Sequence, residues 1–357
     1  MAPVINGLRR ANGIDSEVCV TAQHRQMLDQ VLQLFEIRPD YDLNIMTPGQ
    51  DLSDITANIL IGLRSILKAR RYDMLLVHGD TTTTLAASLA AFYEKIPVAH
   101  VEAGLRTGNI YAPWPEEMNR SIVSRIAALH FAPTDRARDA LLREGIPEVA
   151  VRVTGNTVID ALKQVVGKLQ SDQQLLDRFA REFDFLDPNK RLVLVTGHRR
   201  ENFGKGLERI CTALERLSGR GDIQIVYPVH LNPAVQAPVR RILGAAKDVY
   251  LVAPQDYLPF VYLMARSCLI ITDSGGVQEE APSLGKPVLV MRETTERPEA
   301  LDAGTVRLVG TEADKIVREC EMLLDDVAAY DRMARAVNPY GDGKAADRIV
   351  ATLQQGL

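Results

Sequence analysis

The chain has 357 residues, 46% of them hydrophobic and 25% charged, an ordinary globular composition with enough length for two domains. Its 42 lysines and arginines against 46 aspartates and glutamates give a net charge of −4, which argues against electrostatic binding to nucleic acid. No apolar run is long enough to span a membrane, and the first residues lack the layout of a signal peptide. The four cysteines lie far apart and suit neither a zinc site nor a disulfide framework, so we expect a cytoplasmic protein.

A helix is expected at the start of the chain, because Met1, Val4, Ile5 and Leu8 share one helical face. Short β-branched runs then alternate with helix-sized segments, and this alternation predicts the α/β class with doubly wound sheets. Several runs are apolar throughout, as expected of parallel strands that helices cover on both faces. The expected strands are 17–21, 74–78, 98–102, 151–154, 192–196, 223–228, 249–252, 269–272, 287–290 and 305–309. The expected helices include 25–35, 82–93, 116–129, 207–217 and 277–284.

The polar stretch 171–190 precedes a fresh strand and predicts the seam between two stacked α/β domains with a cleft between them. In open parallel sheets, ligands bind beyond the carboxyl ends of the strands. Functional side chains are therefore expected directly after strands.

Three carboxylates follow successive strands in the first half of the chain. Asp80, after a His-Gly turn, either caps the next helix or serves a site. Glu102 either pairs with Arg106 or is aimed into the cleft, where a carboxylate is costly unless it is paired or functional. Glu116 and Glu117 begin a helix, and the helix dipole explains both adequately. Only the concurrence of Asp80, Glu102 and Glu116 suggests a cluster.

Two loops in the second half have the features of anion-binding sites. The loop 196–206 joins a strand to a helix and contains glycines, basic residues and His198, which is either structural or a phosphate ligand. The turn Ser274-Gly275-Gly276 follows a later strand and opens a helix, and Glu280 lies where it can accept hydrogen bonds from ribose hydroxyls. Two such loops, three carboxylates and no metal motif suggest a sugar-nucleotide site.

At these segments the chain resembles the non-hydrolysing UDP-N-acetylglucosamine 2-epimerases, and the enterobacterial type in particular. The resemblance covers essentially the whole chain. The segments that carry it, in order, are His78-Gly-Asp-Thr-Thr-Thr, Val101-Glu-Ala-Gly-Leu-Arg-Thr, Pro115-Glu-Glu, Thr154-Gly-Asn-Thr-Val, Thr196-Gly-His-Arg-Arg-Glu, Pro228-Val-His-Leu-Asn-Pro, Asp273-Ser-Gly-Gly-Val-Gln-Glu-Glu-Ala-Pro and Asn338-Pro-Tyr-Gly-Asp-Gly.

The resemblance implies a GT-B architecture of two Rossmann-like domains that face a cleft. The N-terminal domain is expected over 1–165 and is completed by the helix 343–357, and the UDP-binding domain is expected over 166–342. The implied activity is reversible conversion of UDP-N-acetylglucosamine to UDP-N-acetylmannosamine by elimination of UDP to 2-acetamidoglucal and re-addition, for surface polysaccharide synthesis. The resemblance also implies a homodimer and a reaction that needs no cofactor or metal, and the charge and composition predict no nucleic-acid or membrane partner. A GT-B glycosyltransferase and a catalytically impaired nucleotide-sugar binding protein are the alternatives.

The resemblance also assigns roles to individual residues. It implies catalytic roles for Asp80, Glu102, Glu116 and His198. Contacts to UDP are implied for His198, Phe260, Ser274, Gly275, Gly276 and Glu280. A second, allosteric UDP-N-acetylglucosamine site is implied for Gln23, Gln26, Arg199 and His230.

The start of the chain departs from the family pattern. Family members begin with a strand and a Gly-Thr-Arg-Pro-Glu loop that continue into Met-Ala-Pro, whereas this chain starts at Met1-Ala-Pro3. We therefore expect the first strand to be missing, with Met1 either an internal methionine taken as the start or the point at which the chain was cut. A chain this short is expected to fold and work poorly, because a central sheet edge is left unpaired.

Overall fold

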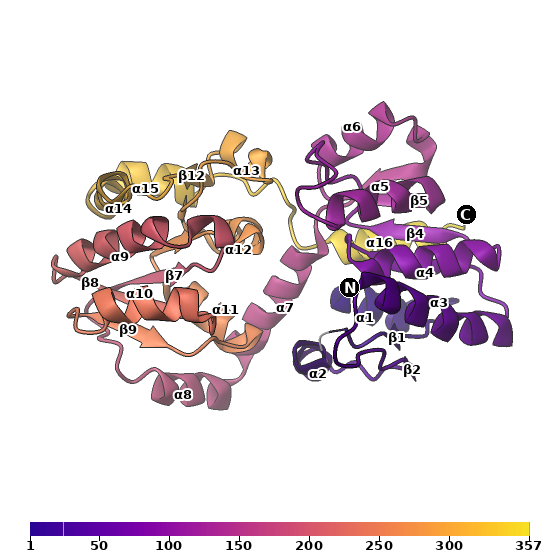
Figure 1. Ribbon diagram of the computed structural model, residues 1–357, viewed down its shortest axis with the longest axis horizontal. Helices are drawn as coiled ribbons and strands as arrows, with labels where there is room; N and C mark the ends of the chain where they lie inside the picture. Colours follow the sequence, from indigo (N-terminus) through magenta and orange to yellow (C-terminus); the bar gives the residue numbers. More distant parts are fainter. Residues whose placement is uncertain (24, 357) are drawn as a thin grey trace. The chain divides into compact units, whose positions relative to one another are not determined.

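The computed structural model describes residues 1–23 and 25–356, which divide into two compact units (Figure 1). The first unit comprises Met1–Ala161 and Tyr340–Leu357, and the second comprises Leu162–Pro339. The division falls inside helix α7 (Thr157–Ser171), earlier than the expected seam. The polar stretch 171–190 instead contains helix α8 (Gln173–Glu182) and belongs to the second unit.

The first unit contains a four-stranded parallel sheet in the order β3-β4-β5-β6, and a separate parallel pair, β1-β2. The strands are β1 (Cys19–Val20), β2 (Tyr41–Asp42), β3 (Leu75–His78), β4 (Val98–Val101), β5 (Leu129–Ala132) and β6 (Val151–Val153). Because the strands of the larger sheet are parallel, β3 and β4 end at the same edge, and Asp80 and Glu102 follow them there.

Helices cover the two faces of this sheet. Alternate residues of a strand point to opposite faces, so Val98 packs with one group of helices and Ala99 with the other. Ala99 and Val101 pack against α1 and α16, while Val77 and Val98 pack against α3, α4 and α5. The helices of this unit are α1 (Ala2–Arg10), α2 (Arg25–Leu34), α3 (Leu52–Ala69), α4 (Thr82–Tyr93), α5 (Glu116–Ile126), α6 (Asp135–Arg143), the 3₁₀ turn η1 (Glu148–Ala150) and α16 (Ala345–Gln354).

The second unit contains a six-stranded parallel sheet in the order β12-β11-β10-β7-β8-β9. The strands are β7 (Arg191–Thr196), β8 (Ile223–Pro228), β9 (Val249–Val252), β10 (Leu269–Thr272), β11 (Val288–Val290) and β12 (Val306–Leu308). The strand order reverses between β7 and β10, which is where a doubly wound sheet binds ligands. The loop after β7 and the turn after β10 both begin at this point.

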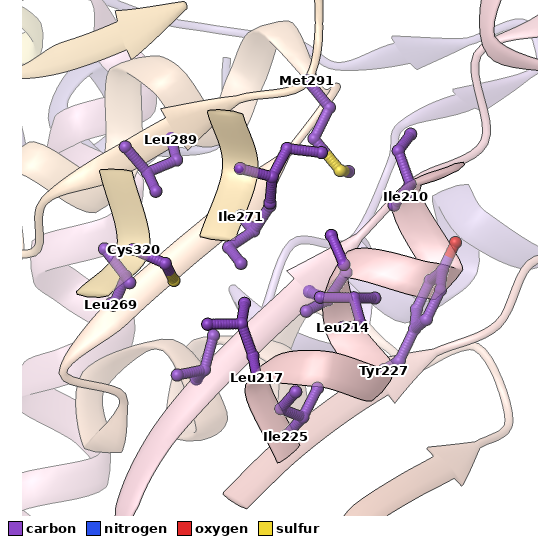
Figure 2. Packing of buried hydrophobic residues seen from close by; sticks show 14 of the residues in the cluster. Ile210, Leu214, Leu217, Ile225, Tyr227, Leu269, Ile271, Leu289, Met291 and Cys320 are labelled. Atoms are coloured by element: carbon purple, nitrogen blue, oxygen red, sulfur yellow. The ribbon is translucent and has the colours of Figure 1, made fainter. Parts of the chain in front are cut away.

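The main core of the second unit lies between its sheet and helices α9, α10 and α14. Figure 2 shows Ile210, Leu214 and Leu217 of α9 packed with Ile225 and Ile271 of the sheet. The remaining elements of this unit are η2 (Arg200–Asn202), α9 (Lys205–Ser218), α10 (Pro233–Leu243), α11 (Tyr257–Arg266), α12 (Gly275–Glu280), η3 (Ala281–Leu284), α13 (Pro298–Asp302), α14 (Ala313–Asp325) and α15 (Val327–Ala334). The expected α/β class with parallel sheets is confirmed.

Several expected boundaries were wrong. The helix expected over 116–129 ends at Ile126, and its last expected residue belongs to β5, which the sequence analysis missed. Ala127 and Ala128 separate the two elements, and alanine gives no signal for a helix end. The helix expected over 277–284 consists of α12 and η3, and Pro282, which lacks an N–H group, lies in the tighter second part. Within the described residues, none of the helices has the length and apolar character needed to cross a bilayer.

Candidate active site

Asp80 lies in the turn between β3 and α4, and three side chains fix this turn. The ring Nε2 of buried His100 donates to the carbonyl of Gly79 at 2.7 Å, and Gly79 has a φ of +70° that glycine adopts without strain. The Asn119 amide donates to the main-chain carbonyl of Asp80 at 2.9 Å. The Arg120 guanidinium donates to the Asp80 carboxylate at 3.1 Å. Asp80 is therefore held through its backbone and its side chain.

The helix-cap interpretation of Asp80 is wrong. Thr81 is the N-cap of α4, and its hydroxyl accepts a hydrogen bond from the N–H of Thr84. The Asp80 carboxylate is directed to Arg120 instead, and 27% of the side chain remains exposed to solvent.

Glu102 follows β4 directly and has a φ of +62°, a left-handed conformation that a non-glycine residue adopts at an energetic cost. Its Oε2 lies 3.2 Å from Nε2 of His78. The proposed Glu102–Arg106 salt bridge was wrong, because the Arg106 guanidinium pairs with Glu144 at 2.7 Å and donates to Ser124. A strained acid at the carboxyl end of a strand is typical of a functional position.

The two neighbouring glutamates of α5 have different environments. Glu116 is half-buried at the first position of the helix. Glu117 is buried and accepts hydrogen bonds from the N–H groups of Thr107 and Gly108, at 3.0 and 2.9 Å, and from Arg120. Burial opposes ionisation of Glu117, but these donors outweigh it and hold its pKa below the ordinary value. The helix dipole favours both glutamates equally, but packing buries only Glu117 and gives it hydrogen-bond donors.

The first unit therefore brings Asp80 and Glu102 to one edge of its sheet and holds the helix that begins with Glu116 beside Asp80. Asp80 and Glu102 follow adjacent parallel strands, and α5, which begins with Glu116, is hydrogen-bonded to Asp80 through two of its residues. Arg120 was not predicted as a site residue, although an arginine one helical turn beyond a glutamate was a usable signal.

Asp273, for which the sequence predicted no role, holds the loop after β7 in the second unit. It is 1% exposed, and its Oδ2 accepts hydrogen bonds from the main-chain N–H groups of His198 and Arg199, both at 2.9 Å, and from Asn202 at 3.2 Å. The exposed His198 ring stacks on that of His230, with centroids 5.6 Å apart. The loop is thereby fixed with its histidine facing outward.

Two guanidinium groups lie beside the Ser-Gly-Gly turn. A Cβ atom added to Gly275 would lie 3.7 Å from Nη2 of Arg199 and 3.9 Å from the guanidinium carbon of Arg297. Arg199 pairs with Glu296 at 3.4 Å, and Arg297 pairs with Glu279. Two arginines at a glycine turn can bind an anion such as a diphosphate. Arg297 was missed, because it is distant in sequence from both predicted loops.

Glu280 ends α12 and is buried, and it accepts a hydrogen bond from the hydroxyl of Tyr257. Burial disfavours the charged form and raises the pKa of Glu280 to about 7. Phe260 lies one turn beyond Tyr257 on α11 and is half-buried. A buried acid beside an aromatic residue can bind a nucleoside through its ribose hydroxyls and its base.

The residues of the expected second UDP-sugar site belong to both units. Gln23 is half-buried and accepts a hydrogen bond from Thr83 at 3.3 Å, and Gln26 is exposed on α2. Arg199 and His230 lie in the second unit. Arg199 directly follows His198 in the sequence, and the His230 ring stacks on the His198 ring.

Comparison with known proteins decides the family. The sequence profile described as UDP-N-acetylglucosamine 2-epimerase matches residues 6–354. The chain belongs to the UDP-N-acetylglucosamine 2-epimerase family. The UDP-N-acetylglucosamine 2-epimerase of Escherichia coli K12 is 59% identical over 355 residues, covering 99% of this chain and 94% of that protein. The Yersinia pestis enzyme of the same name is also 59% identical, with the same coverage.

Solved structures of this epimerase family have the same fold. The crystal structure of the Neisseria meningitidis UDP-GlcNAc 2-epimerase bound to UDP-GlcNAc matches with a TM-score of 0.92 at 53% identity, over 100% of this chain and 96% of that one. The Methanocaldococcus jannaschii enzyme in complex with UDP-GlcNAc and UDP matches with a TM-score of 0.81 at 33% identity, over 99% and 96%. These matches confirm the GT-B fold class. A Rickettsia africae glycosyltransferase, 13% identical with a TM-score of 0.62, shares the fold alone.

Proposed function

We propose that this protein is an epimerase that interconverts UDP-N-acetylglucosamine and UDP-N-acetylmannosamine. The observation that carries the proposal is the family match along residues 6–354, together with the anion-binding groups and carboxylates that the two units hold in place. The relatives whose crystal structures contain UDP-GlcNAc support the same substrate.

The proposed reaction avoids direct removal of an unactivated proton. C2 of the sugar has no adjacent carbonyl, so a side-chain base cannot take its proton unaided. The C1–O bond to UDP breaks first, its electron pair leaves with UDP, and the oxocarbenium-like state makes the C2 proton acidic. A base then takes that proton to leave 2-acetamidoglucal. Protonation from the opposite face and re-addition of UDP at C1 give the epimer, so no net oxidation occurs.

We assign the proton transfers to the first unit. Asp80, Glu102 and Glu116 are the proposed catalytic carboxylates, and each proton-transfer step of this kind typically contributes about 10²–10⁴-fold. A carboxylate also stabilises the positive charge that develops as the C1–O bond breaks. The fixed backbone at Asp80 and the strained one at Glu102 support a role in which geometry matters.

We assign binding of UDP to the second unit. The turn at Ser274–Gly276, the two neighbouring guanidinium groups and His198 supply donors for the departing diphosphate, where negative charge accumulates in the transition state. Glu280 is the proposed ribose ligand and Phe260 the proposed neighbour of uracil. His198 also stabilises the leaving group, which makes it part of the catalytic machinery.

We further propose a second, regulatory UDP-N-acetylglucosamine site that uses Gln23, Gln26, Arg199 and His230. The stacked His198 and His230 rings support it, because His230 itself contacts a proposed diphosphate-binding residue. Activation would appear as sigmoidal dependence of UDP-N-acetylmannosamine turnover on UDP-N-acetylglucosamine. Hyperbolic kinetics in the H230A variant and in the wild type alike would contradict it.

We also propose that the protein is a homodimer and acts in the cytoplasm to supply surface polysaccharide synthesis. The neighbouring aromatic side chains Phe92 and Tyr93, 59% and 65% exposed at the end of α4, support an apolar contact surface. The unpaired cysteines suit a reducing compartment. Light scattering coupled to gel filtration should give twice the chain mass, and the mass of one chain would contradict the dimer.

The proposed function is tested by incubating the protein with UDP-N-acetylglucosamine in D₂O and following C2 by NMR. Deuterium at C2 together with UDP-N-acetylmannosamine supports the epimerase. Binding without exchange would identify a nucleotide-sugar binding protein. Release of UDP only when an acceptor is added would identify a glycosyltransferase. Heat-denatured protein is the control for uncatalysed exchange.

A further inference from the structure

Arg120 is a buried cation with two carboxylate partners. Its side chain is 7% exposed, and it lies on α5 between the beginning of that helix and the β3–α4 turn. Nε donates to Glu117 Oε2 at 2.7 Å and Nη2 donates to the same atom, while Nη1 donates to Asp80 Oδ2 at 3.1 Å. Because a guanidinium is planar and rigid, binding to Glu117 along one edge fixes the direction in which Nη1 points.

Glu117 has little capacity left for any other partner. Its Oε1 accepts from the N–H groups of Thr107 and Gly108, and its Oε2 accepts from Arg120 and again from Thr107 at 3.1 Å. A carboxylate has about four lone-pair positions, and these donors account for them. Glu117 is also 2% exposed, so its carboxylate has almost no surface that a substrate can contact. Its contacts tie Arg120 to the loop that follows Glu102.

Asp80 is held by two successive residues of the same helix. Asn119 binds its main-chain carbonyl and Arg120 binds its carboxylate, so α5 fixes both the backbone and the side-chain torsion. The Asp80 side chain nevertheless remains 27% exposed, against 3% for that of Glu117. Asp80 is therefore the accessible acid of the two. Glu117 is inaccessible and holds Arg120, which in turn orients Asp80.

We propose that Arg120 is a positioning residue of the epimerase reaction: oriented by Glu117, it fixes the carboxylate of Asp80 for proton transfer, and Glu117 transfers no proton itself. This inference rests on the proposed function and assigns roles at the same site. Arg120 acts only through Asp80, so removing the guanidinium matters only while the Asp80 carboxylate is present.

A double-mutant cycle tests this directly. We expect R120M to lower kcat by at least about tenfold with less than about threefold change in KM, since Asp80 is misplaced but UDP binding is not. In the D80N background, R120M should change kcat by less than about threefold. Single-turnover measurement of deuterium incorporation at C2 reaches the low rates of these variants. If the kcat of the R120M/D80N variant is lower than that of D80N by the same factor that R120M causes alone, the proposal is overturned.

Two further comparisons separate positioning from damage to the fold. R120M leaves the buried Glu117 carboxylate without its cationic partner, which can prevent folding. If R120M does not fold, the E117Q/R120M variant, which removes both charges, takes its place in the cycle. If Arg120 acts only through Asp80, the loss of kcat caused by E117Q/R120M should also disappear in the D80N background. R125M is the matched control, because Arg125 lies on the same helix and is exposed, and it should keep wild-type kcat.

The wild type distinguishes failure of the proposal from failure of the proposed function. Wild-type protein that incorporates no deuterium at C2 would refute the epimerase function itself. An active wild type with multiplying losses would overturn only the role of Arg120. E117Q adds a direct test, because the proposal expects it to have no further effect once Arg120 is replaced, whereas a proton-transferring Glu117 would lower kcat in both backgrounds.

Discussion

The hydroxyl of Tyr257 donates a hydrogen bond to the carboxylate of Glu280, an acid that is 6% exposed at the end of α12. Burial raises the pKa of Glu280 to about 7, even though the tyrosine donor favours the charged form. Such an acid destabilises the fold when it is ionised, and a perturbed pKa of this kind is typical of residues with a functional use. In the proposed function that use is the ribose.

Replacing Glu280 by glutamine should therefore stabilise the fold at alkaline pH. A group whose folded pKa is raised contributes stability below its unfolded pKa and loses it as pH rises through the folded value, here between about 4.5 and 7. At pH 8, E280Q should be more stable by on the order of 1–3 kcal/mol, with little difference at pH 4.5. Thermal unfolding at both pH values measures this. Equal stability at pH 8 would contradict the burial argument.

The same E280Q variant should bind UDP less tightly. A glutamine amide is a weaker acceptor for ribose hydroxyls than a carboxylate, and we expect roughly tenfold lower affinity by calorimetry. E215Q is the matched control, because Glu215 is exposed on α9 of the same unit. If both variants bind UDP like the wild type, Glu280 is not the ribose ligand.

Asp80→Asn or Glu116→Gln should reduce turnover much more than affinity. Loss of a proton-transferring carboxylate is expected to lower kcat by about 10²–10⁴-fold while the Kd for UDP-N-acetylglucosamine stays nearly unchanged. Steady-state kinetics and calorimetry give the two quantities. E148Q, at an exposed glutamate of the same unit, is the control. Near-normal turnover in D80N and E116Q would remove both residues from the chemistry.

His198→Ala and Asp273→Asn should differ in their effect on stability. His198 has a side chain that is 47% exposed, so its loss should weaken UDP binding roughly tenfold and leave the melting temperature unchanged. Asp273 accepts several hydrogen bonds in a buried position, so D273N should cost about 1–3 kcal/mol of stability and weaken UDP binding as well. A D273N protein with full stability and affinity would show that Asp273 does not hold the loop.

The first unit should lose stability in mild acid. Burial lowers the pKa of His100 to about 3 and that of His130 to about 4, from an ordinary 6.5. Between the folded pKa values and 6.5, the unfolded chain binds more protons than the folded protein. The contribution of the neutral histidines to stability is therefore complete above pH 6.5 and is lost as the pH falls toward 4. At pH 5 each histidine should cost about 1–2 kcal/mol relative to pH 7.5.

Hydrogen exchange of the β4 and β5 amides at pH 7.5 and 5 measures this loss, after correction for the intrinsic rates. H130L removes one of the two buried imidazoles and should reduce the difference between the two pH values. Protection in these strands that is independent of pH would show that the histidines are not buried in their neutral forms.

The sequence predicted the positions of those strands that form a short apolar run of their own. The strands expected over 223–228, 249–252 and 269–272 coincide with β8, β9 and β10, because each is a short run rich in β-branched and other apolar residues. The carboxylates and loops were also found locally, since they follow strands. β2 was missed, because a two-residue strand has no periodicity to detect.

By itself the sequence determined the class of fold, the family and the set of polar residues at strand ends, because these depend on short-range patterns and on motifs in a fixed order. Tertiary structure alone decided that Arg120 reaches Asp80 across 40 residues and that Asp273 holds the His198 backbone across 75. Hydrogen bonds between residues so far apart depend on which strands lie side by side. That order follows from packing of the whole sheet, and no local pattern encodes it.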